Sequence, residues 1–288
     1  MAKEMVVELG DGRALHVYDS GASGDGFVVF WHSGTPQSGI LPGPLLELPQ
    51  YQHIRWLSMD RPGYGASTPL PGRRVVSVAG DVAAVADALG VERFAVMGTS
   101  GGGPHALACA AMLPERVTAV VCVATLAPFG VDGLDWMAGM GEAGVAELAA
   151  AVQGRAALRT YVTTADPDLA TVFTPTDLDA LSEGPYGEWL ATTVKRGMAG
   201  GLDGLIDDDL AFVAPWGFDP ARITAPMLLV HGGEDRTVPS THADWLANRC
   251  RTAELRLYPD DGHISILDHC AAALDWLAGR NGDDSGGK

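Results

Sequence analysis

The pattern of apolar and polar positions divides most of the chain into short buried runs and helical stretches. Six apolar runs of strand length, each bounded by loop-forming residues, lie at 27–32, 54–60, 94–98, 117–125, 225–233 and 253–259. Four stretches typical of helices lie between or after them, at 76–90, 103–114, 240–250 and 265–279. Alternating residues over 6–21 surround Asp11 and Gly12, which predicts a β-hairpin. Strands that alternate with helices predict an α/β fold whose mostly parallel sheet is covered on both faces.

Residues 126–218 interrupt this alternation. The segment contains helical pieces rich in Ala, Gly, Trp and Met and no convincing buried strand. We therefore predict a core formed by 1–125 and 219–280, with 126–218 as an inserted helical segment. The tail, 281–288, is polar and rich in glycine, and we predict that it is disordered.

Composition and charge narrow the class of protein. The 288 residues are 47% hydrophobic, enough for a large core, yet no run of 18 apolar residues predicts a transmembrane helix. The N-terminus carries no secretory signal pattern, and a net charge of −17 argues against nucleic acid or an anionic membrane as a partner. The four cysteines form no CxxC pair, which favours buried thiols over a disulfide or zinc framework. We expect a cytoplasmic protein, and its oligomeric state stays open.

One serine stands out as a candidate nucleophile. Residues 98–102 read Gly-Thr-Ser-Gly-Gly, a G-x-S-x-G motif between a predicted strand and a predicted helix. In a nucleophile elbow such a serine occupies a sharp turn, and small residues on either side let strand and helix pack closely. The motif alone is weak evidence in a chain with 37 glycines, but its place between strand and helix supports a role for Ser100.

A serine nucleophile needs a general base and an acid that orients it. Of the eight histidines, His263 lies in the loop after the last predicted strand, from which it can reach the edge of the sheet where Ser100 lies. Glu234 and Asp235 follow the strand at 225–233, and we favour Asp235 because a turn follows it directly. The order Ser100, Asp235, His263 is that of the α/β hydrolases.

These motifs together resemble the serine hydrolases of the α/β-hydrolase fold family, esterase- or lipase-like enzymes with a helical cap, and the resemblance covers nearly the whole chain. It implies the α/β-hydrolase fold, with 126–218 as the cap. It also implies an oxyanion hole formed by the N–H groups of Gly101 and Thr35, or of Gly34 if the loop aligns one position earlier. The departure from the family is Ser33, which stands where the family has a histidine, while His32 lies one position earlier. The segment 60–67 resembles the family's D-R-x-G-x-G-x-S, so we expect Asp60 and Arg61 to brace the loops near the site.

The expected function is hydrolysis of a carboxylic ester or lactone, as by a carboxylesterase, through an acyl-enzyme and without metal or cofactor. We expect a small, largely apolar molecule as substrate and partner, bound in a pocket lined by residues of the cap. The candidates for that lining are Phe129, Trp136, Met140, Trp189 and Met198.

Three alternatives stay open at this point. One is a peptidase resembling proline iminopeptidase, for which acidic residues of the insert, among them 207–209, would bind a free amino terminus. Another is a hydrolase of carbon–carbon bonds. The third is a binding protein of the same fold that performs no catalysis.

Overall fold

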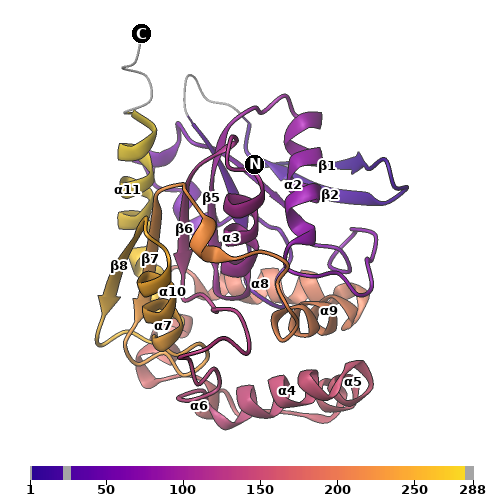
Figure 1. Ribbon diagram of the computed structural model, residues 1–288, viewed down its shortest axis with the longest axis vertical. Coiled ribbons are helices and arrows are strands. Elements are labelled where there is room, and N and C mark those ends of the chain that lie inside the picture. Colours follow the sequence, from indigo (N-terminus) through magenta and orange to yellow (C-terminus); the bar gives the residue numbers. More distant parts are fainter. Residues whose placement is uncertain (1, 22–26, 283–288) are drawn as a thin grey trace.

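A single eight-stranded sheet runs through the molecule, whose computed structural model describes residues 2–21 and 27–282. The strand order is β1-β2-β4-β3-β5-β6-β7-β8 (Figure 1). The strands are β1 (Lys3–Glu8), β2 (Ala14–Asp19), β3 (Val28–His32), β4 (Arg55–Met59), β5 (Phe94–Thr99), β6 (Val117–Val123), β7 (Met227–Gly232) and β8 (Ala253–Tyr258). The predicted α/β architecture with a mostly parallel sheet is confirmed, and each of the six predicted apolar runs contains a strand.

The direction of the strands sets where the loops gather. β1 and β2 form the predicted hairpin, and β2 pairs antiparallel with β4. All pairings from β4 across to β8 are parallel. The loops that leave the carboxyl ends of β3, β5, β7 and β8 therefore lie along the same edge of the sheet.

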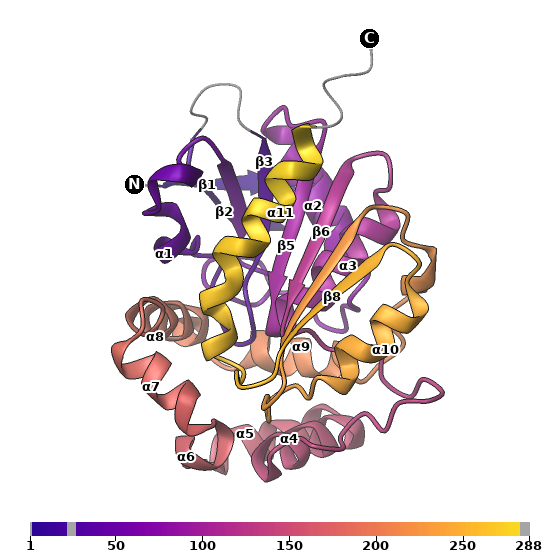
Figure 2. The ribbon, with the colours of Figure 1, turned by 90° about the vertical axis from the view of Figure 1, so that its left-hand side faces the viewer.

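Helices cover both faces of the sheet because its central strands are apolar on both sides. Neighbouring residues of β3 point in opposite directions: Phe30 packs into the core under α2 and α3, and Trp31 into the core under α11. Figure 2 shows α11 crossing one face with α2 and α3 behind the sheet. The helices of the core are α1 (Gly43–Leu46), α2 (Ser77–Ala88), α3 (Gly103–Met112), α10 (Thr241–Arg249) and α11 (Cys270–Gly282).

The last helix differs from its prediction at both ends. Residues 265–269 form a 3-10 turn, and α11 extends to Gly282. Positions 281 and 282, predicted as part of a disordered tail, are therefore helical, and the rest of that tail, 283–288, lies outside the described residues.

The segment between β6 and β7 consists of turns followed by helices, without any strand in 126–218. It lies across the end of the sheet to which β5 and β6 point, as Figure 1 shows. A small cluster of Ala150, Ala151, Leu158 and Ile206 gives it apolar packing of its own. Its helices are α4 (Glu142–Gln153), α5 (Arg155–Thr164), α6 (Leu169–Val172), α7 (Pro175–Glu183), α8 (Gly187–Gly197) and α9 (Asp203–Phe212).

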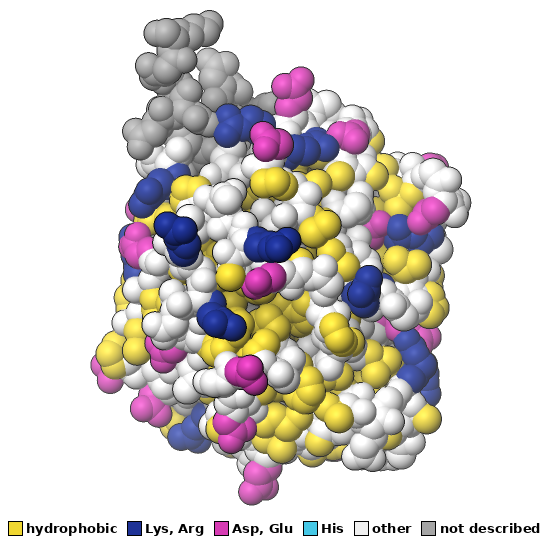
Figure 3. All heavy atoms as spheres, in the orientation of Figure 1, with side chains coloured by type: hydrophobic (Ala, Val, Ile, Leu, Met, Phe, Trp, Pro, Cys, Tyr) yellow, Lys and Arg dark blue, Asp and Glu magenta, His cyan; other side chains and the backbone are white. Residues whose placement is uncertain are grey.

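The distribution of charged side chains on the surface and the apolar character of the helices relate to the prediction that neither nucleic acid nor a membrane is a partner. On the face in Figure 3, Lys and Arg side chains are interspersed with Asp and Glu and form no continuous basic patch. Within residues 2–21 and 27–282, no helix has the length and apolar character that crossing a membrane requires.

Candidate active site

Ser100 occupies a strained turn directly after β5. Its φ is +50°, in the left-handed region that side chains other than glycine rarely adopt. The turn is possible because its neighbours are glycines: a Cβ on Gly98 would lie 2.5 Å from the carbonyl oxygen of Gly102, and one on Gly102 would lie 2.0 Å from that of His32. The chain thus reverses into α3 in very little space, and Ser100 is left at the carboxyl edge of the sheet.

The structure brings Ser100, His263 and Asp235 together from loops after three different strands. His263 Nε2 lies 3.0 Å from Ser100 Oγ, and His263 Nδ1 lies 2.7 Å from Asp235 Oδ2. The other oxygen of Asp235, Oδ1, accepts hydrogen bonds of 2.8 Å from the N–H groups of Thr237 and Val238. The turn after Asp235, which singled this residue out in the sequence, thus holds its carboxylate in place.

The electrostatics of the three residues suit a base and its orienting acid. Burial alone would lower the pKa of His263, but the Asp235 carboxylate outweighs this, and the pKa stands above its ordinary value. Burial would raise the pKa of Asp235, but His263, with the nearby His231, lowers it well below the usual range. Asp235 is therefore ionised at neutral pH, and His263 is poised to accept a proton from Ser100.

The loop of Ser33, Gly34 and Thr35 lies against the serine turn. Thr35 and Gly101 line the same cavity as Ser100, and a Cβ on Gly101 would lie 2.5 Å from Thr35 Oγ1. Gly34 does not line that cavity, and its carbonyl oxygen points to Arg61 instead. Of the two alignments, the geometry favours Thr35 as the partner of Gly101.

Arg61 braces this loop, as the sequence led us to expect of the segment 60–67. Its Nη1 donates to the carbonyl oxygen of Ser33 at 2.5 Å, and its Nη2 donates to that of Gly34 at 3.0 Å. His32 stacks on Phe30 with ring centroids 5.3 Å apart, inside the core, where burial lowers its pKa and keeps it neutral. Arg61, and not His32, therefore braces the loop, and Asp60 supports the next turn by accepting from the N–H of Gly39 at 2.7 Å.

The cavity at Ser100 has two lobes, of about 450 and 290 Å³, that share Thr35, Pro36, Ser100 and Thr237. The larger lobe is mainly apolar, and its wall includes Leu169, Phe173, Leu181, Leu190, Ala191, Val194, Ile264 and Leu267. The smaller lobe combines Leu126, Leu148, Leu205, Phe212 and Val238 with two acidic residues, Glu147 and Asp209. Its apolar wall comes from both the core and the insert.

None of the five residues predicted to line the pocket does so, and this is a correction. Trp136 packs edge-on against Phe129 and donates its indole N–H to the carbonyl oxygen of Ala127, inside the protein. Met140 is buried and faces a different surface hollow, which includes Arg236.

The other two residues predicted to line the pocket, Trp189 and Met198, belong to α8 and to the turn after it. Trp189 packs against Trp31 and donates to the carbonyl oxygen of Leu41. Met198 is exposed in the turn that follows the helix. The face of α8 that lines the cavity carries Leu190 and Val194, which are four residues apart.

Two functional residues that the sequence did not single out are aspartates of the insert. Asp177 contacts the loop of His263, and Asp208 contacts the loop of Thr35. Asp177 stands three residues after Thr174, a spacing that indicates a helix cap and hides any further role. Asp208 lies in a run of three aspartates that read as surface acidity or as groups for an amino terminus.

Metal-binding geometry is absent from the part of the chain that the structure describes, where no three His, Cys, Asp or Glu side chains form a cluster suited to a metal ion. All four cysteines are free and buried.

Comparison with known proteins agrees with this geometry. The chain matches the model of the alpha/beta hydrolase fold family over residues 28–269. It is 28% identical over 261 residues to a pimeloyl-[acyl-carrier protein] methyl ester esterase of Nitrosomonas europaea, covering 88% of this chain and 94% of that protein. It is 26% identical over 273 residues to a 2-hydroxy-6-oxononadienedioate/2-hydroxy-6-oxononatrienedioate hydrolase of Burkholderia vietnamiensis, covering 92% and 89%. Among solved structures, a thermophilic esterase of Thermogutta terrifontis superposes with a TM-score of 0.72 at 18% identity, over 97% of this chain and 99% of that one.

Proposed function

Because this chain belongs to the α/β-hydrolase fold family, we propose that it is a serine hydrolase that cleaves a carboxylic ester or lactone through an acyl-enzyme. The observation that carries the proposal is His263, which contacts Ser100 with one ring nitrogen and Asp235 with the other. The similarity to a methyl ester esterase over most of both chains supports ester cleavage.

The proposed reaction proceeds in two halves. Ser100 Oγ attacks the carbonyl carbon of the ester while its proton passes to His263 Nε2, and the N–H groups of Thr35 and Gly101 stabilise the oxyanion. Collapse of this intermediate breaks the bond to the alcohol, which takes the proton from His263. A water molecule then gives a proton to His263 and attacks the acyl carbon, and the second collapse returns the proton to Ser100 Oγ as the acid leaves. Asp235 holds the imidazole and stabilises its protonated form throughout.

The lining of the cavity supports a small, largely apolar substrate. The apolar wall of the larger lobe suits a hydrocarbon chain or ring. Polar groups also line the cavity: the carboxyl groups of Glu147 and Asp209 in the smaller lobe and the amine of Lys195 in the larger one. The helical segment 126–218 supplies much of the wall of the cavity and so acts as the cap.

Cleavage of a carbon–carbon bond is the second candidate. The similarity to a 2-hydroxy-6-oxononadienedioate/2-hydroxy-6-oxononatrienedioate hydrolase over most of both chains favours it.

We also propose that the protein works in the cytoplasm. Its four cysteines are buried thiols without disulfide partners. Free thiols persist in a reducing compartment, whereas secreted proteins tend to oxidise them.

The test is turnover of a substrate panel by the wild type, Ser100→Ala and a control, Ser182→Ala, which changes an exposed serine of α7. The panel contains p-nitrophenyl esters of increasing acyl length, a δ-lactone, a proline arylamide and a 2-hydroxy-6-oxodienoate. We expect ester or lactone turnover in the wild type and control and its loss in Ser100→Ala. Faster turnover of the arylamide or the oxodienoate than of every ester would contradict the proposal and assign the site to that other chemistry.

A further inference from the structure

The insert reaches past the cavity and makes buried contacts with both loops of the catalytic machinery. Two of its carboxylates do this, Asp177 of α7 and Asp208 of α9, and they are 1% and 0% exposed. We infer that these two aspartates are positioning residues, so that the insert holds the oxyanion loop and the loop of His263 in their working geometry. The inference rests on the proposed function, because the loops matter for Ser100 chemistry.

Asp208 lies at the centre of a network formed by residues of the core. Oδ2 accepts from Thr35 Oγ1 at 2.7 Å, and it pairs with Arg61 Nη2 at 2.6 Å. Arg61 is the side chain that holds the carbonyl oxygens of Ser33 and Gly34. One carboxylate oxygen thus fixes the oxyanion loop twice, through the hydroxyl of Thr35 and through the brace behind it.

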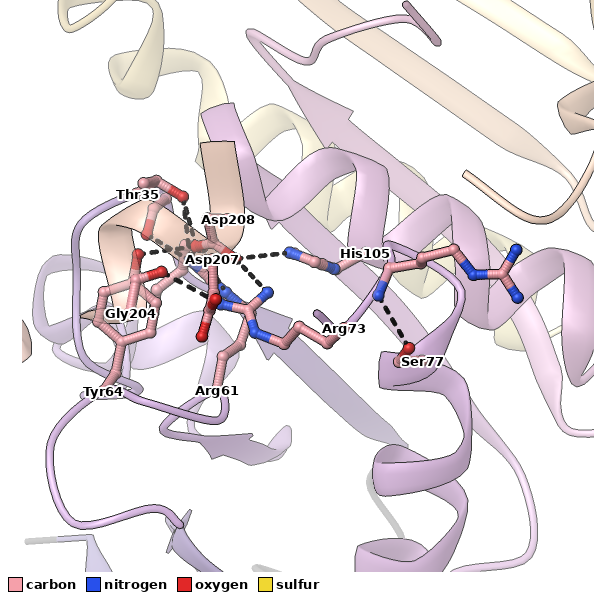
Figure 4. A network of polar contacts seen from close by, with 12 residues as sticks. Thr35, Arg61, Tyr64, Arg73, Ser77, His105, Gly204, Asp207 and Asp208 are labelled. Carbon is pink, nitrogen blue, oxygen red and sulfur yellow. Dashed lines mark hydrogen bonds and ion pairs between the residues drawn. The ribbon is translucent and has the colours of Figure 1, made fainter. Parts of the chain in front are cut away.

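The other contacts of Asp208 hold the carboxylate itself. Oδ1 pairs with Arg73 at 2.6 Å and lies 3.3 Å from His105 Nε2, and Oδ2 accepts from the hydroxyl of Tyr64 at 2.8 Å. Figure 4 shows Thr35, Tyr64 and Arg61 on one side of Asp208 and His105 on the other. Since His105 belongs to α3, the helix that Ser100 introduces, Asp208 also links the oxyanion loop to the nucleophile's helix.

The carboxylate of Asp208 is ionised at neutral pH. Burial would raise the pKa of Asp208, but Arg61 and Arg73 outweigh it and hold the pKa well below the ordinary range. His105 is neutral because burial lowers its pKa to about 4. The carboxylate is therefore a permanent acceptor for the hydroxyl of Thr35.

Asp177 serves the other loop through the backbone. Its Oδ2 accepts from the N–H of His263 at 3.1 Å, and its Oδ1 accepts from the N–H groups of Ile264 at 2.7 Å and Ser265 at 3.0 Å. Three consecutive N–H groups of the loop thus point to one carboxylate. Gly262 precedes them because a Cβ there would lie 2.1 Å from Asp177 Oδ2.

Asp177 also adds negative charge near the proposed base. Asp177 stays ionised because the N–H groups of the loop outweigh the effect of burial and lower its pKa. Its charge acts with that of Asp235 to raise the pKa of His263. Other charged or titratable groups near His263 include Asp235, which pairs with its Nδ1, His231, which lies 3.5 Å from Asp235 Oδ2, and Lys195, which lines the same lobe of the cavity.

For Asp208 the test is kcat per active site, counted by titration with a fluorophosphonate taken to completion. Asp208→Asn is compared with Asp207→Asn, which removes a neighbouring aspartate of α9 that pairs with Arg155 inside the insert. We expect Asp208→Asn to lower kcat per site by about 10- to 100-fold with KM changed less than about threefold, because the oxyanion forms only in the transition state. Asp207→Asn should stay within about twofold of the wild type.

If Asp208→Asn does not fold, Thr35→Val and Thr35→Ser test the same contact from the core side. Thr35→Val removes the hydroxyl that Asp208 accepts, and Thr35→Ser keeps it, so we expect the serine variant to retain the higher kcat per site. Equal values in Thr35→Val and Thr35→Ser, or in Asp208→Asn and Asp207→Asn, would overturn the role of Asp208.

For Asp177 the readout is the pH profile of kcat/KM. Asp177→Asn should move its acidic limb to lower pH, because His263 loses a nearby negative charge, whereas Thr174→Val, which removes the capping hydroxyl but keeps the Asp177 carboxylate, should leave the limb in place. Gly262→Ala, whose Cβ would displace the carboxylate, replaces Asp177→Asn if that variant does not fold. An unmoved limb with wild-type kcat per site would overturn the role of Asp177.

The rate of fluorophosphonate labelling at Ser100 separates this inference from the proposed function. A wild type that labels rapidly but hydrolyses no ester would contradict the proposed function, and the same variants can then be ranked by labelling rate. A wild type that hydrolyses esters, with every insert variant equal to its control, would contradict the inference alone. A wild type that neither labels nor hydrolyses would overturn both.

Discussion

The two ring nitrogens of His263 contact different partners, Asp235 and Ser100, and these contacts determine both the geometry and the electrostatics of the site. The 2.7 Å contact of Nδ1 with Asp235 fixes which nitrogen faces Ser100. It also stabilises the protonated imidazole that forms when Ser100 attacks. The state that accepts a proton is the neutral ring, so activity depends on the pKa of His263.

The first prediction is the pH dependence of kcat/KM. Asp235 raises the pKa of His263, so we expect kcat/KM to fall as the pH drops through a value above the ordinary 6.5. Asp235→Asn removes the carboxylate that raises this pKa, so its limb should move to lower pH, and its plateau should fall by about 10⁴-fold through loss of the orienting acceptor.

The control for this measurement is Glu234→Gln, which changes the exposed neighbour of Asp235. It should leave both the limb and the plateau unchanged. A limb that stayed in place in Asp235→Asn would show that another group controls the profile.

The second prediction concerns the glycines of the turn. A Cβ on Gly102 would lie 2.0 Å from the backbone oxygen of His32, which no side-chain motion can relieve, so Gly102→Ala should lower the free energy of unfolding by about 2 kcal/mol or more. Gly80→Ala, in α2, has open space around its Cβ and should instead raise it by about 0.5–1 kcal/mol. Urea unfolding of both variants provides the comparison, and equal stabilities would contradict the close packing of β5 and α3.

At the residue scale, the sequence predicted a catalytic residue wherever a motif coincided with the end of a predicted strand. Ser100, Asp235 and His263 each lie in the turn or loop that follows a strand, and parallel strands bring such positions to one edge. Asp177 and Asp208 have no such signal, because each lies on a helix of the insert and acts on a distant loop. Their partners are 86 and 173 residues away in the chain for the contacts with His263 and Thr35.

At the scale of elements, the helices of the insert divide their faces between packing and the cavity. α8 turns Leu190 and Val194 to the cavity and Trp189 to the core. The sequence predicted Trp189 and Trp136 as lining residues because large aromatic side chains often line pockets. Both instead donate their indole N–H to backbone oxygens, and only the fold shows where such a partner lies.

The third prediction follows from this division. Val194→Trp should fill part of the larger lobe and raise KM for a p-nitrophenyl octanoate by about tenfold or more while leaving the acetate nearly unchanged. Met198→Trp, four residues further on and exposed, should change neither value. Steady-state kinetics over acyl length measures this, and an octanoate KM that was the same in both variants would place the acyl chain elsewhere.

The fourth prediction concerns α9, where Asp209 is 4% exposed and lies beside Glu147. Burial and the negative charge of Glu147 raise the pKa of Asp209 well above 3.8. The folded state therefore keeps a proton that the unfolded chain has released, and this carboxyl lowers stability as the pH rises from about 4 towards the folded-state pKa.

Asp209→Asn, which does not titrate, should remove this part of the pH dependence. The midpoint of urea unfolding should gain more from the substitution at pH 8 than at pH 5, while Asp244→Asn, an exposed aspartate of α10, should show no such difference. A gain that was the same at both pH values would mean that Asp209 is ionised in the folded protein.

At the scale of the whole molecule, strand order explains why a pattern along the chain predicts a site in space. β5, β6, β7 and β8 are neighbours in the sheet and all parallel, so the loops after β5, β7 and β8 converge although Ser100 and His263 are 163 residues apart. The alternation of apolar runs and helices was enough to predict that arrangement. The fold of the insert was not predictable in the same way. Its helices do not alternate with strands of the sheet, and their contacts depend on tertiary packing.

The central claim is that ester cleavage passes through a covalent acyl group on Ser100. The direct measurement is an acid quench of the protein during turnover of a p-nitrophenyl ester, followed by mass spectrometry of its peptides. We expect the peptide that contains Ser100 to gain the mass of the acyl group, and the adduct to be absent from Ser100→Ala. Sustained turnover without an adduct, or an adduct on another residue that persists in Ser100→Ala, would contradict the account.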